Sequence, residues 1–159
     1  NGFYKVKEEA NARFDAISRE YIYKIHQNKN PFLNNRSLFY KGSINIHLMN
    51  EACKVLVASS DFQSFSKVKT EVDNFKCVIN YARFEKSNDN FNFLISSNRF
   101  LRGMVRCIVG TLLKVSEKKI SLEKFNKIVE NKNREGAGPS VLASGLYLSK
   151  VEYPSNIYI

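Results

Sequence analysis

The chain has 159 residues, of which 43% are hydrophobic and 13% aromatic, so it is large enough for one domain with a buried core. It contains no run of about 18 apolar residues, which excludes a transmembrane helix, and its opening residues lack the apolar block of a signal peptide. The formal net charge of +10 favours a polyanionic partner, either nucleic acid or an acidic membrane surface. A soluble protein that is merely basic is the alternative.

The cysteines and histidines point to no metal or disulfide chemistry. The three cysteines are widely spaced, which argues against a disulfide framework and favours a reducing compartment, the cytoplasm. The two histidines, His26 and His47, lie in no metal-binding motif. We therefore expect no zinc site.

Hydrophobic periodicity and breaker residues predict a mixed set of elements. In chain order they are a strand over 16–26, a helix over 45–58 capped by Asn45, a hairpin of strands over 76–85 and 90–97, helices over about 100–116 and from Ser121, and a last strand from Gly145 ended by Pro154. This order predicts an α+β fold with a mainly antiparallel sheet and helices packed on one face.

The helix predicted over 100–116 carries an unusual set of arginines. Arg99, Arg102 and Arg106 follow at spacings of three and four, which would place them on one helix face. A like-charged pair at positions i and i+4 destabilises a helix unless an anion offsets it. Arg106 falls at the margin of the apolar stripe, where an arginine either pairs with a carboxylate or phosphate or extends its charged end into water. Arg99 and Arg102 would face a nucleic-acid backbone or solvent.

The remaining polar and aromatic residues form no motif for a reaction. Tyr21 and Tyr23 share one face of the first strand, where they belong to the core or stack on an unpaired base. None of the aspartates lies in a motif for a nucleophile or a general base, and Asp61 is expected to cap a turn. No glycine-rich phosphate loop or catalytic triad order is present.

Taken together, four stretches resemble the TruA-type family of tRNA pseudouridine synthases. They are ARFDAISREYIYKI (12–25), DFQSFSK (61–67), NRFLRGMVRCIVGTLLKV (98–115) and ASGLYLSKVEYP (143–154). Their order and separation are similar to those of the C-terminal half of the family's proteins. The resemblance covers about residues 10 to 154, nearly the whole chain.

The resemblance implies isomerisation of uridine to pseudouridine at positions 38 to 40 of the tRNA anticodon stem-loop, without a cofactor. By this resemblance Tyr21 and Arg106 are catalytic residues: Tyr21 stacks on the flipped uracil, and Arg106 pairs with the aspartate nucleophile. Leu146 lines the uracil pocket. We assign Arg13, Arg99 and Arg102 to the RNA backbone.

The Gly-Arg-Thr-Asp motif that holds the family's aspartate is absent from this sequence. We therefore expect residues 1–159 to be the C-terminal domain of a longer chain, inactive alone and homodimeric in its intact form. The N-terminal half of the same protein would supply the aspartate. A second hypothesis is a non-catalytic module that binds tRNA or other RNA, and a third is a basic protein with another anionic partner.

Overall fold

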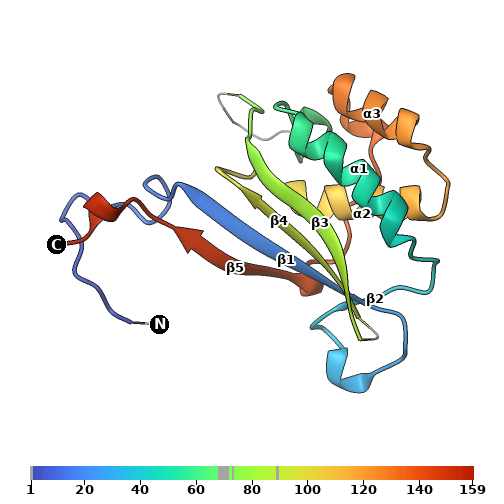
Figure 1. Cartoon of the computed structure of the whole chain (residues 1–159), viewed down its shortest axis with the longest axis horizontal. Coiled ribbons are helices and arrows are strands. Elements are labelled where there is room, and N and C mark those ends of the chain that lie inside the picture. The colour runs from blue at the N-terminus through green and yellow to red at the C-terminus, as the bar shows by residue number, and fades with distance from the viewer. Residues whose placement is uncertain (1, 68–71, 73, 89) are drawn as a thin grey trace.

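The fold is an α+β arrangement in which three helices pack against one side of a five-stranded sheet (Figure 1). The computed structural model describes residues 2–67, 72, 74–88 and 90–159. Its strands and α-helices, in chain order, are β1 Ser18–His26, β2 Leu38–Phe39, α1 Ile46–Ala58, β3 Ile79–Ser87, β4 Asn90–Ser97, α2 Met104–Ser116, α3 Leu122–Glu130 and β5 Leu146–Glu152.

Strand β1 lies inside the sheet and pairs with three other strands. One edge of β1 pairs along nearly its whole length with β4, which in turn pairs with β3. The other edge is shared, because β5 pairs with Ser18–Tyr23 and β2 pairs with Ile25 and His26. All of these pairings are antiparallel except the short one between β1 and β2, so the predicted mainly antiparallel α+β fold is confirmed.

The core lies between the sheet and the helices, where side chains of alternate strand residues meet the apolar face of α2. Tyr23, Phe93 and Phe84 form one cross-strand row and are almost completely buried. Nearly all of α2 is buried beneath its neighbours, since Arg106 and Lys114 are its only partly exposed residues. Strands β1 and β5 continue past the ends of the helices, so that one end of the sheet lacks helical cover (Figure 1).

Most predicted elements are present near their expected positions. Asn45 caps α1 by accepting the Leu48 N–H, and Ser121 caps α3 by accepting the Lys124 N–H. Asp61 accepts the Gln63 N–H in a turn, as expected. The two-residue strand β2 was not predicted, because Leu38 and Phe39 are too short a run to show a period. Asp73 and Asp89 lie outside the described residues.

The predicted helix over 100–116 is wrong at its start. Helix α2 begins at Met104, because Gly103 adopts a left-handed conformation with φ of 77° and acts as its N-cap. Arg99 and Arg102 therefore precede the helix, and they do not share a helix face with Arg106. The expected repulsion between i and i+4 arginines within a helix does not arise.

The two ends of the chain lie together at the uncovered end of the sheet (Figure 1). Val6 forms a bridge with Tyr158, and the Lys7 N–H donates to the Ile157 carbonyl over 3.0 Å. Among the described residues, no helix is long and apolar enough to cross a membrane.

Candidate active site at the start of α2

Arg106 lies in the first turn of α2 and is held there by the loop that precedes β5. Its Nε donates to the Val141 carbonyl oxygen over 2.6 Å, and the Val141 N–H donates back to the Arg106 carbonyl over 3.2 Å. The side chain is half-buried, and among the described residues no carboxylate forms an ion pair with it. The guanidinium is thus fixed at Nε, which leaves its two terminal nitrogens for an anion.

The loop that holds Arg106 also forms a hydrogen bond to α2. The Gly138 N–H donates to Thr111 Oγ1 over 2.8 Å, further along α2 than Arg106. Gly110 allows this approach, because a Cβ at that position would overlap the Pro139 carbonyl oxygen. The start of α2 and the loop before β5 therefore form one fixed unit.

Tyr23 joins this unit to the sheet. Its ring is fully buried, and its hydroxyl donates to the Leu142 carbonyl oxygen over 2.6 Å. Burial raises the pKa of Tyr23 to about 12, while the positive charge of Arg106 opposes that rise. Leu146, half-buried, lies opposite Tyr23 in the pairing of β1 with β5. The structure thus brings Arg106, Tyr23 and Leu146 to one place.

Tyr21 lies two residues before Tyr23 on the same face of β1, toward the uncovered end of the sheet. It is half-buried and packs edge-to-face on Phe100, with ring centroids 5.1 Å apart. Leu148 lies opposite it on β5. Among the described residues, no hydrogen bond or ion pair joins Tyr21 to Arg106. Its ring is therefore a partly open apolar surface beside the unit that holds Arg106.

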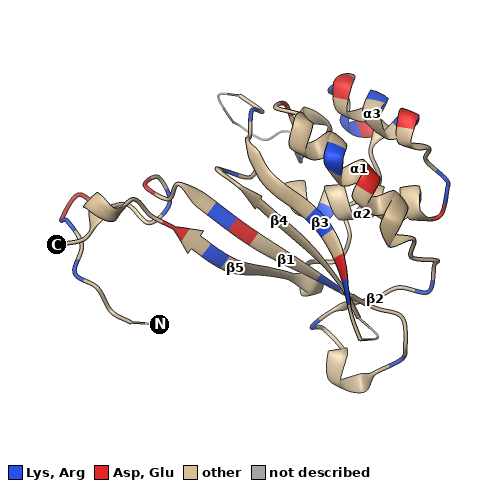
Figure 2. Ribbon diagram, viewed as in Figure 1, with Lys and Arg blue, Asp and Glu red and all other residues tan. Residues whose placement is uncertain are grey.

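The other predicted RNA-binding arginines are spread along the chain. Arg13 is exposed in the segment before β1, with its guanidinium 5.3 Å from the centre of the Phe14 ring. Arg102 is exposed beside Gly103, and its carbonyl oxygen accepts the Lys67 N–H over 2.9 Å. Arg99 is half-buried, and its charge partly offsets the raised pKa of the buried Cys77 thiol. Figure 2 shows that basic and acidic residues alternate on β1, β5 and α3.

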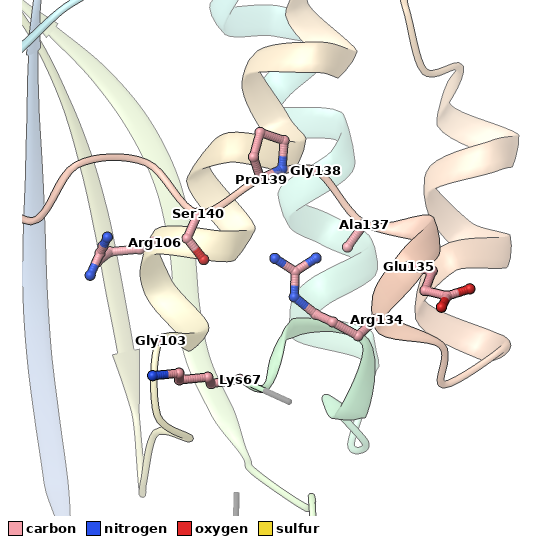
Figure 3. A pocket seen from close by; sticks show the side chains of 9 residues that line it. All are labelled: Lys67, Gly103, Arg106, Arg134, Glu135, Ala137, Gly138, Pro139 and Ser140. Atoms are coloured by element: carbon pink, nitrogen blue, oxygen red, sulfur yellow. The ribbon is translucent and has the colours of Figure 1, made fainter. Parts of the chain in front are cut away.

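A hollow of about 580 Å³ opens beside Arg106, and sequence reasoning missed two of its cations (Figure 3). Lys67 ends the quoted stretch DFQSFSK, and Arg134 lies in a loop rich in glycine between α3 and β5. No periodic pattern or motif spacing connects residues so far apart in the sequence. Their meeting depends on the packing of that loop against α2.

These features define a class of protein. The site combines an arginine whose terminal nitrogens are open to an anion, a partly open tyrosine ring and an apolar wall. Such a combination suits a ligand that is both anionic and planar. Together with a net charge of +10, this combination defines a cationic and partly apolar site on an α+β scaffold, of the kind that suits a polyanion. Within the described residues, no group of three or more His, Cys, Asp or Glu side chains could hold a metal ion.

Comparisons with known proteins agree with this class and refine it. The sequence profile of a family described as tRNA pseudouridine synthase matches residues 52–154, and the chain belongs to that family. It is 44% identical to the tRNA pseudouridine synthase A of Parabacteroides distasonis over 155 residues, which cover 96% of this chain and 61% of the relative. It is 42% identical to the protein of the same name from Porphyromonas gingivalis, over 97% of this chain and 62% of the relative. It is 28% identical to the protein of that name from Staphylococcus aureus, over 98% of this chain and 59% of the relative. The chain thus spans about three fifths of the length of these relatives.

Proposed function

We propose that the protein containing this chain is a tRNA pseudouridine synthase that converts uridine to pseudouridine at positions 38 to 40 of the anticodon stem-loop. Its membership of the family and the printed names of its relatives support this activity. The observation that carries the proposal is the position of Arg106. It is fixed by Val141 beside Tyr23 and Leu146, and among the described residues it has no carboxylate partner.

Tyr21, Leu146 and Arg106 each have a proposed role that suits their surroundings. Tyr21 stacks on the uracil that leaves the RNA helix, because its half-buried ring packs edge-to-face on Phe100 and stays partly open. Leu146 forms the apolar wall of the uracil pocket. Arg106 pairs with the carboxylate of the aspartate nucleophile and holds it in its charged form. Tyr23 is a positioning residue, since its hydroxyl holds the loop that leads into Leu146.

The proposed reaction is an isomerisation, so it needs no oxidant, reductant or other reactant. The bond from the ribose C1′ to N1 of uracil breaks, and a new bond forms from C1′ to C5. The hydrogen on C5 leaves as a proton, and N1 gains a proton. An aspartate carboxylate that bonds to C1′ between these steps is released unchanged.

The nucleophile comes from outside this chain in our proposal. The aspartates Asp15 and Asp61 are described, and neither is paired with Arg106, since Asp15 accepts the Asn11 N–H and Asp61 pairs with Lys132. We propose that the chain is the C-terminal domain of a homodimeric protein whose N-terminal half carries the aspartate. The 159-residue chain alone would then be inactive.

The test uses the complete protein that carries this chain and an unmodified tRNA transcript labelled with tritium at C5 of its uridines. Because C5 loses its hydrogen, pseudouridine formation releases tritium to water, and mapping the product locates it at positions 38 to 40. The 159-residue chain at equal concentration should release none. A complete protein that binds tRNA with a steep salt dependence but releases no tritium would overturn the proposal in favour of a binding module.

A further inference from the structure

The hollow beside Arg106 is built from the segment after η2 (Gln63–Phe65), the start of α2, and the segment that begins with η3 (Arg134–Gly136). Its lining includes the cations Lys67, Arg106 and Arg134. Among the described residues, the one carboxylate in the lining belongs to Glu135, and Figure 3 shows that it points away from the side chains of Arg134 and Ser140. The hollow therefore has an excess of positive charge.

The arginines of the hollow point in different directions. The Arg106 guanidinium points toward β1, on the far side of Ser140 from Arg134 (Figure 3). Arg134 points into the hollow, toward α2 and Ser140. The hollow thus has an anion position separate from the one that Arg106 offers to the active site.

Arg134 contributes little to holding the fold together. It is half-buried, and among the described residues its guanidinium forms no ion pair or hydrogen bond. Burial raises the pKa of the Cys107 thiol on α2 to about 11, and the positive charge of Arg134 partly offsets that rise. A partly desolvated guanidinium without an anion is costly, so an anionic ligand would remove that cost.

The walls of the hollow are fixed before any ligand arrives. The Gly138 N–H bond to Thr111 and the paired backbone bonds of Val141 with Arg106 hold one wall on α2. The Lys67 N–H bond to the Arg102 carbonyl holds another wall beside the start of α2. A site that is already formed loses less entropy on binding.

We propose that Arg134, with Lys67 and the exposed hydroxyl of Ser140, binds a backbone phosphate of the substrate RNA. This rests on the proposed function. The planar guanidinium matches two oxygens of a phosphodiester, and the lysine and serine add donors. Because Arg106 lines the same hollow, that phosphate belongs to a nucleotide close to the one that enters the active site. A hollow of about 580 Å³ is also far larger than a single carboxylate would need.

The experiment measures RNA affinity of the complete protein at several salt concentrations, with an anticodon stem-loop RNA as the probe. The variants are Arg134→Gln and Lys67→Gln. The matched control is Arg36→Gln, which removes the same charge from an exposed arginine outside the hollow. We expect Arg134→Gln to weaken binding about tenfold and to lower the slope of log K against log salt by about 0.7 to 0.9. The control should leave both values unchanged.

Two results would overturn the proposal. One is an unchanged affinity and salt slope in Arg134→Gln. The other is a lower unfolding midpoint of the RNA-free variant with an unchanged salt slope, which would mean that Arg134 binds another segment of the protein. Tritium release separates this proposal from the proposed function. A wild-type protein that binds RNA through Arg134 but forms no pseudouridine would refute the activity and leave the phosphate site standing.

Discussion

Helices cover one end of the sheet and leave the other end uncovered. The candidate site lies at the boundary between these two ends. At the covered end, Tyr23 and Phe93 are completely buried. At the uncovered end, Ile17 just before β1 is 56% exposed. Tyr21, between Ile17 and Tyr23 along β1, is half-buried, and so is Arg106 at the start of α2. A partly covered boundary can hold a side chain rigidly and still leave it open to a ligand.

The largest effect is expected from Arg106→Gln in the complete protein. Glutamine can still donate to the Val141 carbonyl, but it removes the charge that our account pairs with the nucleophile. We expect pseudouridine formation to fall by about a thousandfold or more. Arg102→Gln is the control, because that exposed residue precedes α2, and its loss should cost less than about tenfold. Equal losses in the two variants would remove the special role of Arg106.

The difference between the covered and uncovered ends can be measured at two residues of one strand. Tyr23→Ala removes a fully buried ring and should lower the free energy of unfolding by about 3–5 kcal/mol. Tyr21→Ala removes a half-buried ring and should cost about 1–2 kcal/mol. Urea unfolding gives both values. A larger cost at Tyr21 would contradict the burial that defines the boundary.

A smaller effect is expected where α2 begins. Gly103→Ala places a Cβ on a residue with φ of 77°, which should destabilise the protein by about 1–2 kcal/mol. Gly136→Ala is the matched control, because its φ is not positive and its added Cβ would meet only Ile128 at an ordinary 3.5 Å. Thermal unfolding of both variants tests this. Equal shifts would mean that the left-handed N-cap does not fix the start of the helix.

An effect confined to alkaline pH is expected from Tyr23. Burial raises the pKa of Tyr23 from 10.0 to about 12, so the folded state keeps the neutral phenol that the unfolded state loses. The stabilising contribution of Tyr23 is therefore complete below pH 10.0 and is lost as the pH rises toward about 12. Tyr23→Phe should shrink the fall in unfolding free energy over that range by about 2 kcal/mol. An identical pH dependence in both proteins would contradict it.

Local patterns in the sequence predicted most of the fold. The alternation in 16–26 and the caps at Asn45 and Ser121 depend on neighbouring residues, and the structure has them. The start of α2 was predicted wrongly, because apolar periodicity extends past Gly103 while the backbone conformation of that one residue ends the helix. The prediction that Arg99 and Arg102 share a helix face with Arg106 failed for the same reason.

The candidate site was less accessible to sequence reasoning. The position of Arg106 at the margin of the apolar stripe was readable from helical spacing. Its bond to Val141, and the meeting of Lys67 with Arg134 in the hollow, join segments far apart in the chain. Such contacts follow from how a glycine-containing loop packs on a helix, which no local pattern encodes.

In our proposal, Arg106 is the fixed half of an ion pair whose carboxylate lies outside this chain. A crystal structure of the complete protein, with the distance from the terminal nitrogens of Arg106 to the nearest carboxylate oxygen, tests it most directly. We predict an aspartate of a Gly-Arg-Thr-Asp motif within hydrogen-bonding distance, with the Val141 contact retained. An Arg106 whose terminal nitrogens face only water or backbone carbonyls would contradict the account.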